Sequence, residues 1–198
     1  MAISLGNVFS GATPRTGSGT QMPPVGSYVC DILAVKVEKN PWTADRNDLV
    51  LRLEIADGEY KGAFRKLFDD QKERFGSATY KGDFRIGIPT NSDEQWRKDV
   101  FERALGSIQA SNDGYTINVN DVSDMKGKVV GITIREREYM REGEVRTTRE
   151  VAFLETVSDV ADGKVYKKHY EPRVLKNKPQ TAESNKPTFV EVDEELLF

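Results

Sequence analysis

The feature that most constrains the fold is the alternation of apolar and polar residues in two neighbouring stretches, 27–38 and 49–55. A period of two places every second side chain on one face of a β-strand. The apolar positions of the first stretch are Tyr28, Cys30 and Ile32 in one phase, then Leu33, Val35 and Val37 in the other. Such a phase slip is typical of a β-bulge, which bends a strand. The pattern therefore predicts one long bent strand followed by a second strand.

Further β-type patterns follow at residues 63–68, 128–139 and 145–157. The last two are joined by a charged segment whose turn is expected near Glu142 and Gly143. Before this pair, residues 93–109 carry apolar side chains at helical spacing, namely Trp96, Val100, Phe101, Leu105 and Ile108. The predicted order is three strands, one helix and two strands.

The start of this helix has its own signal. Ser92 is the expected N-cap, and Gln95 stands three residues later, where it would complete a capping box.

This order matches the OB-fold, a mainly β, five-stranded Greek-key barrel with a helix between strands 3 and 4. Another mixed α+β domain stays open as the alternative. We assign residues 25–160 to the barrel. Residues 1–24, rich in Gly, Ser, Thr and Pro, are expected to form a flexible arm. Residues 161–188 read as a basic linker and 189–198 as an acidic tip.

The chain has one cysteine and one histidine, which restricts its chemistry. Cys30 alternates with apolar neighbours and is expected in the core. A single cysteine excludes an intramolecular disulfide and a cysteine-based zinc cluster. His169 lies in a basic stretch, where we expect it to be solvated or to face phosphate. These counts argue against most hydrolase mechanisms, so no enzymatic activity, cofactor or metal is expected.

Apolar runs in the chain stay well short of the roughly 20 residues that span a bilayer. The N-terminal residues also lack the pattern of a signal peptide. The expected location is the cytoplasm, without membrane association.

Several segments resemble a family of phage and prophage proteins that accompany recombination and replication genes and are regarded as single-stranded DNA-binding. The matching segments are PPVGSYVCDILAVKV, LVLRLEIADGEYKGAFRKLF, DMKGKVVGITIREREY and the closing EVDEELLF. They cover most of residues 23–157 and the extreme C-terminus. The turn PWTADRND departs from the pattern because it lacks the glycines of this hairpin. The resemblance implies a protein of phage replication or recombination that acts in the cytoplasm of the bacterial host.

The C-terminal segment is similar to the acidic, phenylalanine-terminated tips of bacterial and phage single-stranded DNA-binding proteins. In that family the tip docks on partner proteins and can fold back onto the DNA groove. The resemblance implies that replication or recombination proteins bind Asp193, Glu194, Glu195, Leu196, Leu197 and Phe198. An ordinary solvated terminus is the alternative.

The charge distribution fits a nucleic-acid binder better than the total does. The net charge of −3 divides into −4 on residues 181–198 and +1 on the remainder. Within residues 61–85, cations alternate with aromatic rings, the combination that holds phosphates and stacks bases. The predicted DNA-binding residues are Trp42, Lys61, Arg65, Lys66, Lys72, Arg74, Phe75, Tyr80, Lys81, Arg85, Arg135 and Arg137.

Among these, Trp42, Phe75 and Tyr80 are the expected stacking rings, because they lie in turn or loop contexts. Arg135 and Arg137 are followed closely by glutamates and would equally suit a salt-bridged edge.

Two other functions stay open. One is an adaptor or structural protein in which the same barrel binds a protein partner. The other is a metal-dependent nuclease using Asp69, Asp70 and Asp83. The sequence leaves the oligomeric state undetermined, a homodimer included.

Overall fold

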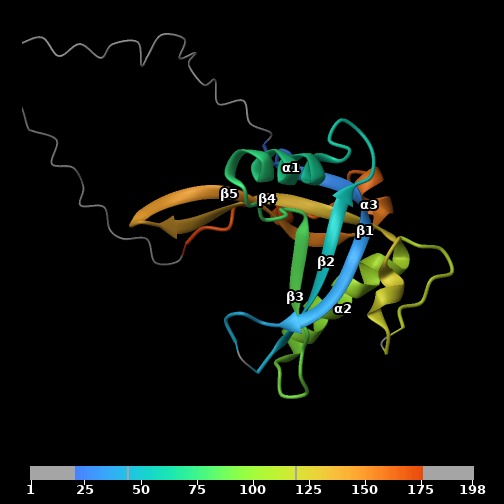
Figure 1. Cartoon of the computed structure of the whole chain (residues 1–198). Coiled ribbons are helices and arrows are strands. Elements are labelled where there is room, and N and C mark those ends of the chain that lie inside the picture. The colour runs from blue at the N-terminus through green and yellow to red at the C-terminus, as the bar shows by residue number, and fades with distance from the viewer. Residues whose placement is uncertain (1–20, 44, 119, 176–198) are drawn as a thin grey trace, which may run out of the picture.

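The computed structural model describes residues 21–43, 45–118 and 120–175. The strands form one antiparallel sheet in the order β3-β2-β1-β4-β5 (Figure 1). In chain order the elements are β1 (Gly26–Lys39), β2 (Asn47–Ile55), α1 (Ala63–Phe75), β3 (Asp83–Gly87), α2 (Gln95–Ala110), β4 (Val129–Arg141), β5 (Glu144–Glu155) and α3 (Val157–Ala161). The number of strands, five, and the position of a helix between the third and fourth agree with the prediction, although the third strand lies at other residues. The sheet is not closed into a barrel, so the OB-fold prediction is not confirmed.

Strand β1 is shared between the two halves of the sheet. Its first part, from Gly26 to Asp31, pairs with β4, and its later part, from Cys30 to Lys39, pairs with β2. The register with β2 shifts between Ile32 and Ala34. The predicted bulge is therefore present, and it lets one strand bend from one half of the sheet into the other.

The β4–β5 hairpin extends beyond the rest of the sheet (Figure 1). Its turn is the predicted one: Glu142 and Gly143 both have positive φ, 54° and 81°, between the paired residues Arg141 and Glu144. Two-residue hairpin loops favour this conformation because its twist matches that of the strands.

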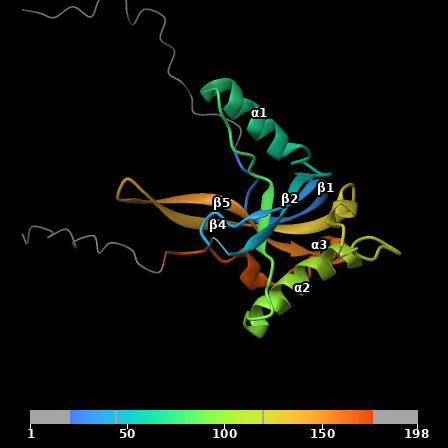
Figure 2. The ribbon, with the colours of Figure 1, turned by 60° about the horizontal axis from the view of Figure 1, so that its bottom comes forward.

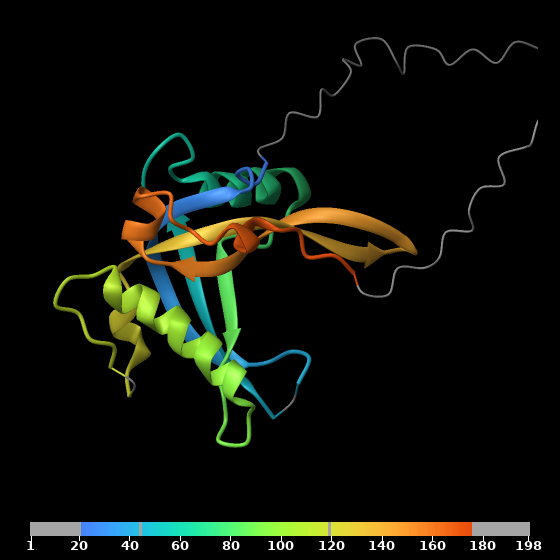
Figure 3. The ribbon, with the colours of Figure 1, turned by 180° about the vertical axis from the view of Figure 1, so that it is seen from behind.

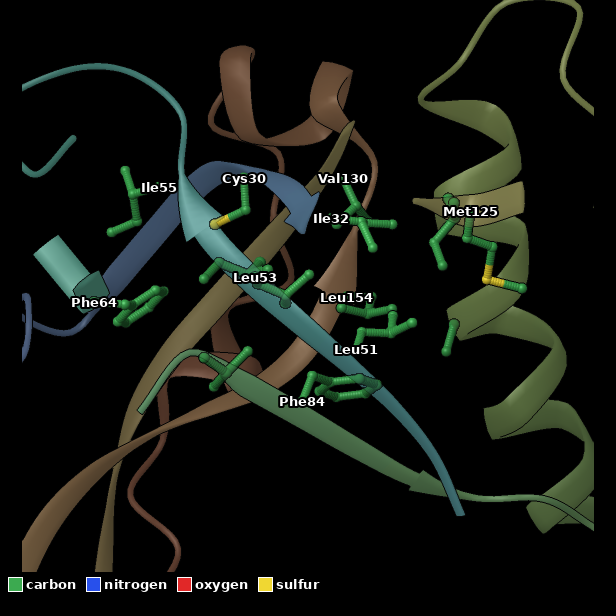
Figure 4. Close-up of a cluster of buried hydrophobic side chains, with 14 of the residues drawn as sticks. Cys30, Ile32, Leu51, Leu53, Ile55, Phe64, Phe84, Met125, Val130 and Leu154 are labelled. Carbon is green, nitrogen blue, oxygen red and sulfur yellow. The ribbon is translucent and has the colours of Figure 1, made fainter. Parts of the chain in front are cut away.

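The core is formed by side chains of the sheet together with Phe64 of α1 and Ile108 of α2 (Figure 4). The figure labels ten of its side chains: Cys30, Ile32, Leu51, Leu53, Ile55, Phe64, Phe84, Met125, Val130 and Leu154. Cys30 is fully buried, as predicted, and burial raises the pKa of its thiol. Alternation thus identified the core-facing positions of β2 and of the first part of β1 correctly. In the second phase of β1, however, Leu33 and Val37 are 40% and 47% exposed, so these two positions were wrong.

The third predicted strand, residues 63–68, is wrong. These residues begin the helix α1 (Ala63–Phe75), and the third strand is β3 (Asp83–Gly87). Phe64, Leu67 and Phe68 have spacings of three and four residues, which places them on one helical face. Over only six residues this spacing was mistaken for alternation.

Helix α2 confirms the predicted helix, but its cap differs. The N-cap is Glu94, not Ser92, and no side chain caps it, so the expected capping box is absent. Figure 2 shows α1 and α2 on opposite sides of the sheet. None of the helices that the structure describes combines the length and apolar character needed to cross a membrane.

Residues 164–175 follow β4 and β5 on the back of the molecule (Figure 3). Val165 is buried, and Arg173 pairs in parallel with Arg137 of β4. The backbone N–H of Arg173 donates to Glu136 at 2.8 Å, and Arg173 accepts from Glu138 at 2.9 Å. This half of the predicted basic linker is therefore docked on the sheet.

The docking overturns the prediction for His169. Its side chain is only 14% exposed and contacts Glu155, so it is neither solvated nor turned towards phosphate. The rest of the predicted linker, most of the N-terminal arm and the acidic tip at 189–198 lie outside the described residues.

Candidate nucleic-acid interface

Helix α1 is anchored to the sheet by a carboxylate of β2. The N-cap, Gly62, has φ 72° and no side chain to cap the helix. Glu54 supplies the missing cap. Its carboxylate accepts hydrogen bonds from the backbone N–H groups of Phe64 at 3.0 Å and Arg65 at 2.7 Å. These are free donors of the first turn, and a negative charge is favourable there. A single strand residue thus fixes the first turn of the helix, and the buried Phe64 and Leu67 pack the rest of it.

The exposed surface of α1 and its flanking turns is basic. Residues 61–81 contain six cations and three carboxylates. Of the cations, Lys61, Arg65, Lys66, Lys72 and Arg74 are exposed, and Lys81 is half-buried. Arg65 forms a long ion pair with Asp69 at 3.6 Å. Within the described residues, Lys66 and Lys72 have no carboxylate within ion-pairing distance.

Phe75 lies at the C-terminal end of the same helix and is 75% exposed. A ring this exposed contributes little to the core. We name the set Lys61, Arg65, Lys66, Lys72, Arg74 and Phe75 the basic helix surface. The structure thus brings together six of the twelve residues that the sequence predicted for DNA binding.

The segment that contains α2 is less basic than α1. Residues 93–124 contain seven carboxylates and three cations. Within α2 itself the cations Arg97, Lys98 and Arg103 outnumber the carboxylates Asp99 and Glu102, so the acidic excess lies in the loops around the helix. Because α1 and α2 lie on opposite sides of the sheet (Figure 2), a polyanion would be attracted more strongly to the α1 side.

The face of β1–β3 that points away from the core is electrically balanced. Arg85 of β3 pairs with Glu38 of β1 and, at 2.8 Å, with the buried carboxylate of Asp48 in β2. Arg52 is held by Asp83 through two hydrogen bonds of 2.9 and 3.0 Å, which raise the pKa of Arg52. Arg85, predicted for DNA binding, is therefore engaged with carboxylates.

A shallow pocket of about 310 Å³ lies on this face, lined by Ala34, Val35, Lys36, Val50, Arg52 and Asp83. Sequence reasoning missed Lys36 and Arg52. The signal was available, because both occupy polar positions of alternating strands.

The hairpin arginines are also paired. Arg135 and Arg137 both contact Glu150, at 3.1 Å each. The salt-bridged edge, given as the alternative for these two residues, describes them better than a set of free cations does.

One of the predicted stacking rings is buried. Tyr80 is only 7% exposed, against Phe64 and Phe68, and its hydroxyl donates to Glu54 at 2.8 Å. Burial, followed by this hydrogen bond, raises its pKa. Tyr80 therefore belongs to the core, and its prediction as an exposed ring was wrong.

Trp42 is 82% exposed, as a stacking ring requires. However, it lies in the loop between β1 and β2, whereas α1 follows the far end of β2. The structure therefore does not bring Trp42 together with Phe75.

A second cleft, of about 410 Å³, separates α1 from the β4–β5 hairpin. Its polar lining comprises Gln21, Gln71, Lys81, Glu136, Thr147, Thr148 and Arg149. Only Lys81 was among the predicted DNA-binding residues. The others could not be found from sequence, because the helix was assigned as a strand and no pattern placed it beside the hairpin.

The acidic residues considered for a nuclease are dispersed. Asp69 and Asp70 lie on α1 and not on a strand, and Asp83 is held by Arg52. Among the described residues, no group of three or more His, Cys, Asp or Glu side chains could hold a metal ion. The tail residues 193–198 lie outside the described part of the chain.

Comparisons with known proteins add no family assignment. No protein-family model matches the chain, and no curated protein matches it.

Proposed function

We propose that the protein binds single-stranded DNA without strong sequence preference and has no enzymatic activity. The observation that carries the proposal is the basic helix surface, where exposed cations and an exposed aromatic ring lie on one helix. Cations attract the phosphates, and a ring stacks on any unpaired base. Duplex DNA offers the phosphates but keeps its bases stacked, so it is expected to bind more weakly.

The proposed fold is an OB-type sheet. Its support is the strand order β3-β2-β1-β4-β5 with α2 between β3 and β4. The two edge strands, β3 and β5, also approach within 8 Å between Cα atoms, as an incompletely closed barrel would allow. OB-folds are partly open barrels that bind oligonucleotides.

The proposed setting is phage replication or recombination in the cytoplasm of a bacterial host. It rests on the sequence resemblance, including the acidic tail. In this proposal Asp193, Glu194 and Glu195 compete with DNA for the basic helix surface, and Leu196, Leu197 and Phe198 bind a replication or recombination protein. Removing residues 189–198 should strengthen binding to oligo-dT at low salt and abolish recruitment of the partner.

A fluorescence-anisotropy titration with labelled oligo-dT and a matched duplex tests the proposal. The variant Lys66→Glu/Lys72→Glu should bind oligo-dT more weakly. Its salt dependence should flatten by about 1.4, since each lost phosphate contact removes roughly 0.7 from the slope of log K against log salt. The matched control is Lys98→Glu/Arg103→Glu on α2, which should retain its affinity.

Equal affinity for duplex and single strand would contradict the proposal. Absence of binding to either would favour the adaptor alternative, and cleavage of the DNA in magnesium would favour the nuclease.

A further inference from the structure

We propose that the cleft between α1 and the β4–β5 hairpin is a second DNA contact, which holds phosphates of a single strand beside the basic helix surface. The inference rests on the proposed function and adds the path of the bound DNA strand, which runs from the exposed side of α1 into this cleft.

The two walls of the cleft come from elements far apart in the sequence. Gln71 and the buried Leu67 belong to α1, whereas Glu136 comes from β4 and residues 147–149 from β5. Lys81, between α1 and β3, adds a cation. The cleft has a volume of about 410 Å³, at the lower end of the range of small-ligand sites, about 300–1,000 Å³. A space of this size suits one nucleotide of a single DNA strand and not a duplex.

The lining suits phosphate oxygens because hydrogen-bond donors dominate it. Lys81 and Arg149 supply two positive charges against the one carboxylate of Glu136. Thr147 and Thr148 offer hydroxyls, and Gln71 offers an amide. These groups match the donors that position nucleic-acid backbones in proteins.

Arg149 is held in place before any ligand arrives. Its Nη1 donates to the carbonyl oxygens of Met22 at 2.7 Å and Pro23 at 3.3 Å. Although Glu136 is its cross-strand partner, no ion pair joins them within the described residues. The remaining N–H groups of the guanidinium are therefore not engaged by a carboxylate there. A preorganised cation costs less conformational entropy when it binds.

Among the residues that the structure describes, none that lines the cleft is aromatic. Bases would therefore find no stacking platform inside the cleft. In this proposal the cleft binds phosphates, and a base stacks on Phe75 of the helix.

The test labels an introduced cysteine, which is possible because the native Cys30 is buried. Because it is the only cysteine in the chain and fully buried, a cysteine introduced at the exposed Thr147 is the one accessible target for a thiol reagent. Saturating oligo-dT should slow the alkylation of Thr147→Cys severalfold. The same reagent should modify Ser158→Cys, on the exposed surface of α3, at an unchanged rate with and without DNA.

An independent variant guards against effects of the introduced cysteine. Lys81→Gln should weaken binding to oligo-dT about tenfold, the equivalent of one charge-assisted hydrogen bond. Lys126→Gln, at an exposed position after α2, is its control and should bind normally.

The outcomes separate the two proposals. If oligo-dT binds tightly but neither protects residue 147 nor depends on Lys81, the cleft proposal is overturned and the DNA-binding proposal stands. If oligo-dT does not bind the intact protein, both proposals fail.

Discussion

The imidazole of His169 and the carboxylate of Glu155 lie 2.6 Å apart, with both side chains largely removed from solvent. The ring of His169 also stacks on Phe153, with centroids 4.0 Å apart and planes at 14°. Glu155 accepts a second hydrogen bond from Thr133 at 2.9 Å. The contact between His169 and Glu155 therefore holds residues 164–175 on the sheet.

Replacing His169 with Ala should release this segment. The change removes a partner of a buried carboxylate, which costs about 1–3 kcal/mol of the free energy of unfolding. Trypsin should then cut between Lys164 and Arg173 faster than in the wild type. Lys168→Arg, in the same turn but exposed, is the control and keeps the trypsin site. If His169→Ala and Lys168→Arg are digested at the same rate, the contact does not hold the segment.

Replacing Glu54 with Ala should destabilise α1 and the core beneath it. The variant loses two hydrogen bonds to the first turn and one from Tyr80. Caps and charge-assisted hydrogen bonds of this kind are worth about 1–3 kcal/mol. Urea denaturation measures the loss, and Glu59→Ala, in the exposed turn before α1, is the control. Equal stability of the two variants would show that Glu54 does not cap the helix.

Substitutions of Phe75 and Ile55 should distinguish an effect on DNA binding from an effect on stability. Phe75→Ala should leave the free energy of unfolding within about 0.5 kcal/mol of wild type. It should weaken binding to oligo-dT by about 1–3 kcal/mol, the worth of one stacked base. Ile55→Ala should cost about 2–5 kcal/mol of stability, because it leaves a cavity in the core. A Phe75→Ala variant that binds normally would remove the ring from the interface.

Asp93 should make the stability sensitive to acid. The backbone N–H of Thr90 donates to its carboxylate at 2.7 Å, and Arg46 pairs with it. Both contacts hold the pKa of Asp93 below its ordinary value of 3.8. A lowered pKa stabilises the fold above the ordinary value, and this contribution is lost as the pH falls through the folded-state pKa.

The stability difference between wild type and Asp93→Asn should therefore be fully present at about pH 6 and shrink below the ordinary pKa. Chemical denaturation at a series of pH values measures it. A difference that is independent of pH would contradict the assignment. Asp113→Asn, at an exposed position, controls for general effects of charge.

Local sequence patterns predicted those elements whose burial is decided within one strand or helix. Alternation in β1 and β2 placed Cys30, Leu51 and Ile55 in the core, and the phase slip located the bulge. The turn at Glu142 and Gly143 followed from its residue types. These features depend on neighbours in sequence, which a pattern records.

Features that depend on distant partners were missed. Tyr80 looked like a loop residue, yet α1 and Glu54 cover it. His169 looked like a solvated member of a basic run, yet Glu155 and Phe153 surround it. The basic helix surface was anticipated by composition, although residues 63–68 were assigned to a strand and Phe75 to a turn or loop. The cleft could not be anticipated, because it exists only where α1 and the hairpin face each other.

The capping of α1 by Glu54 has a consequence for how this chain can change over generations. Most helices carry their cap next to the first turn, so that both vary as one local unit. Here the cap lies on β2, and Gly62 occupies the usual position with a left-handed backbone that other residues rarely adopt. A lineage that lost the carboxylate could not regain the cap at position 62 by one substitution. Relatives that keep Gly at position 62 are therefore expected to keep a carboxylate at position 54.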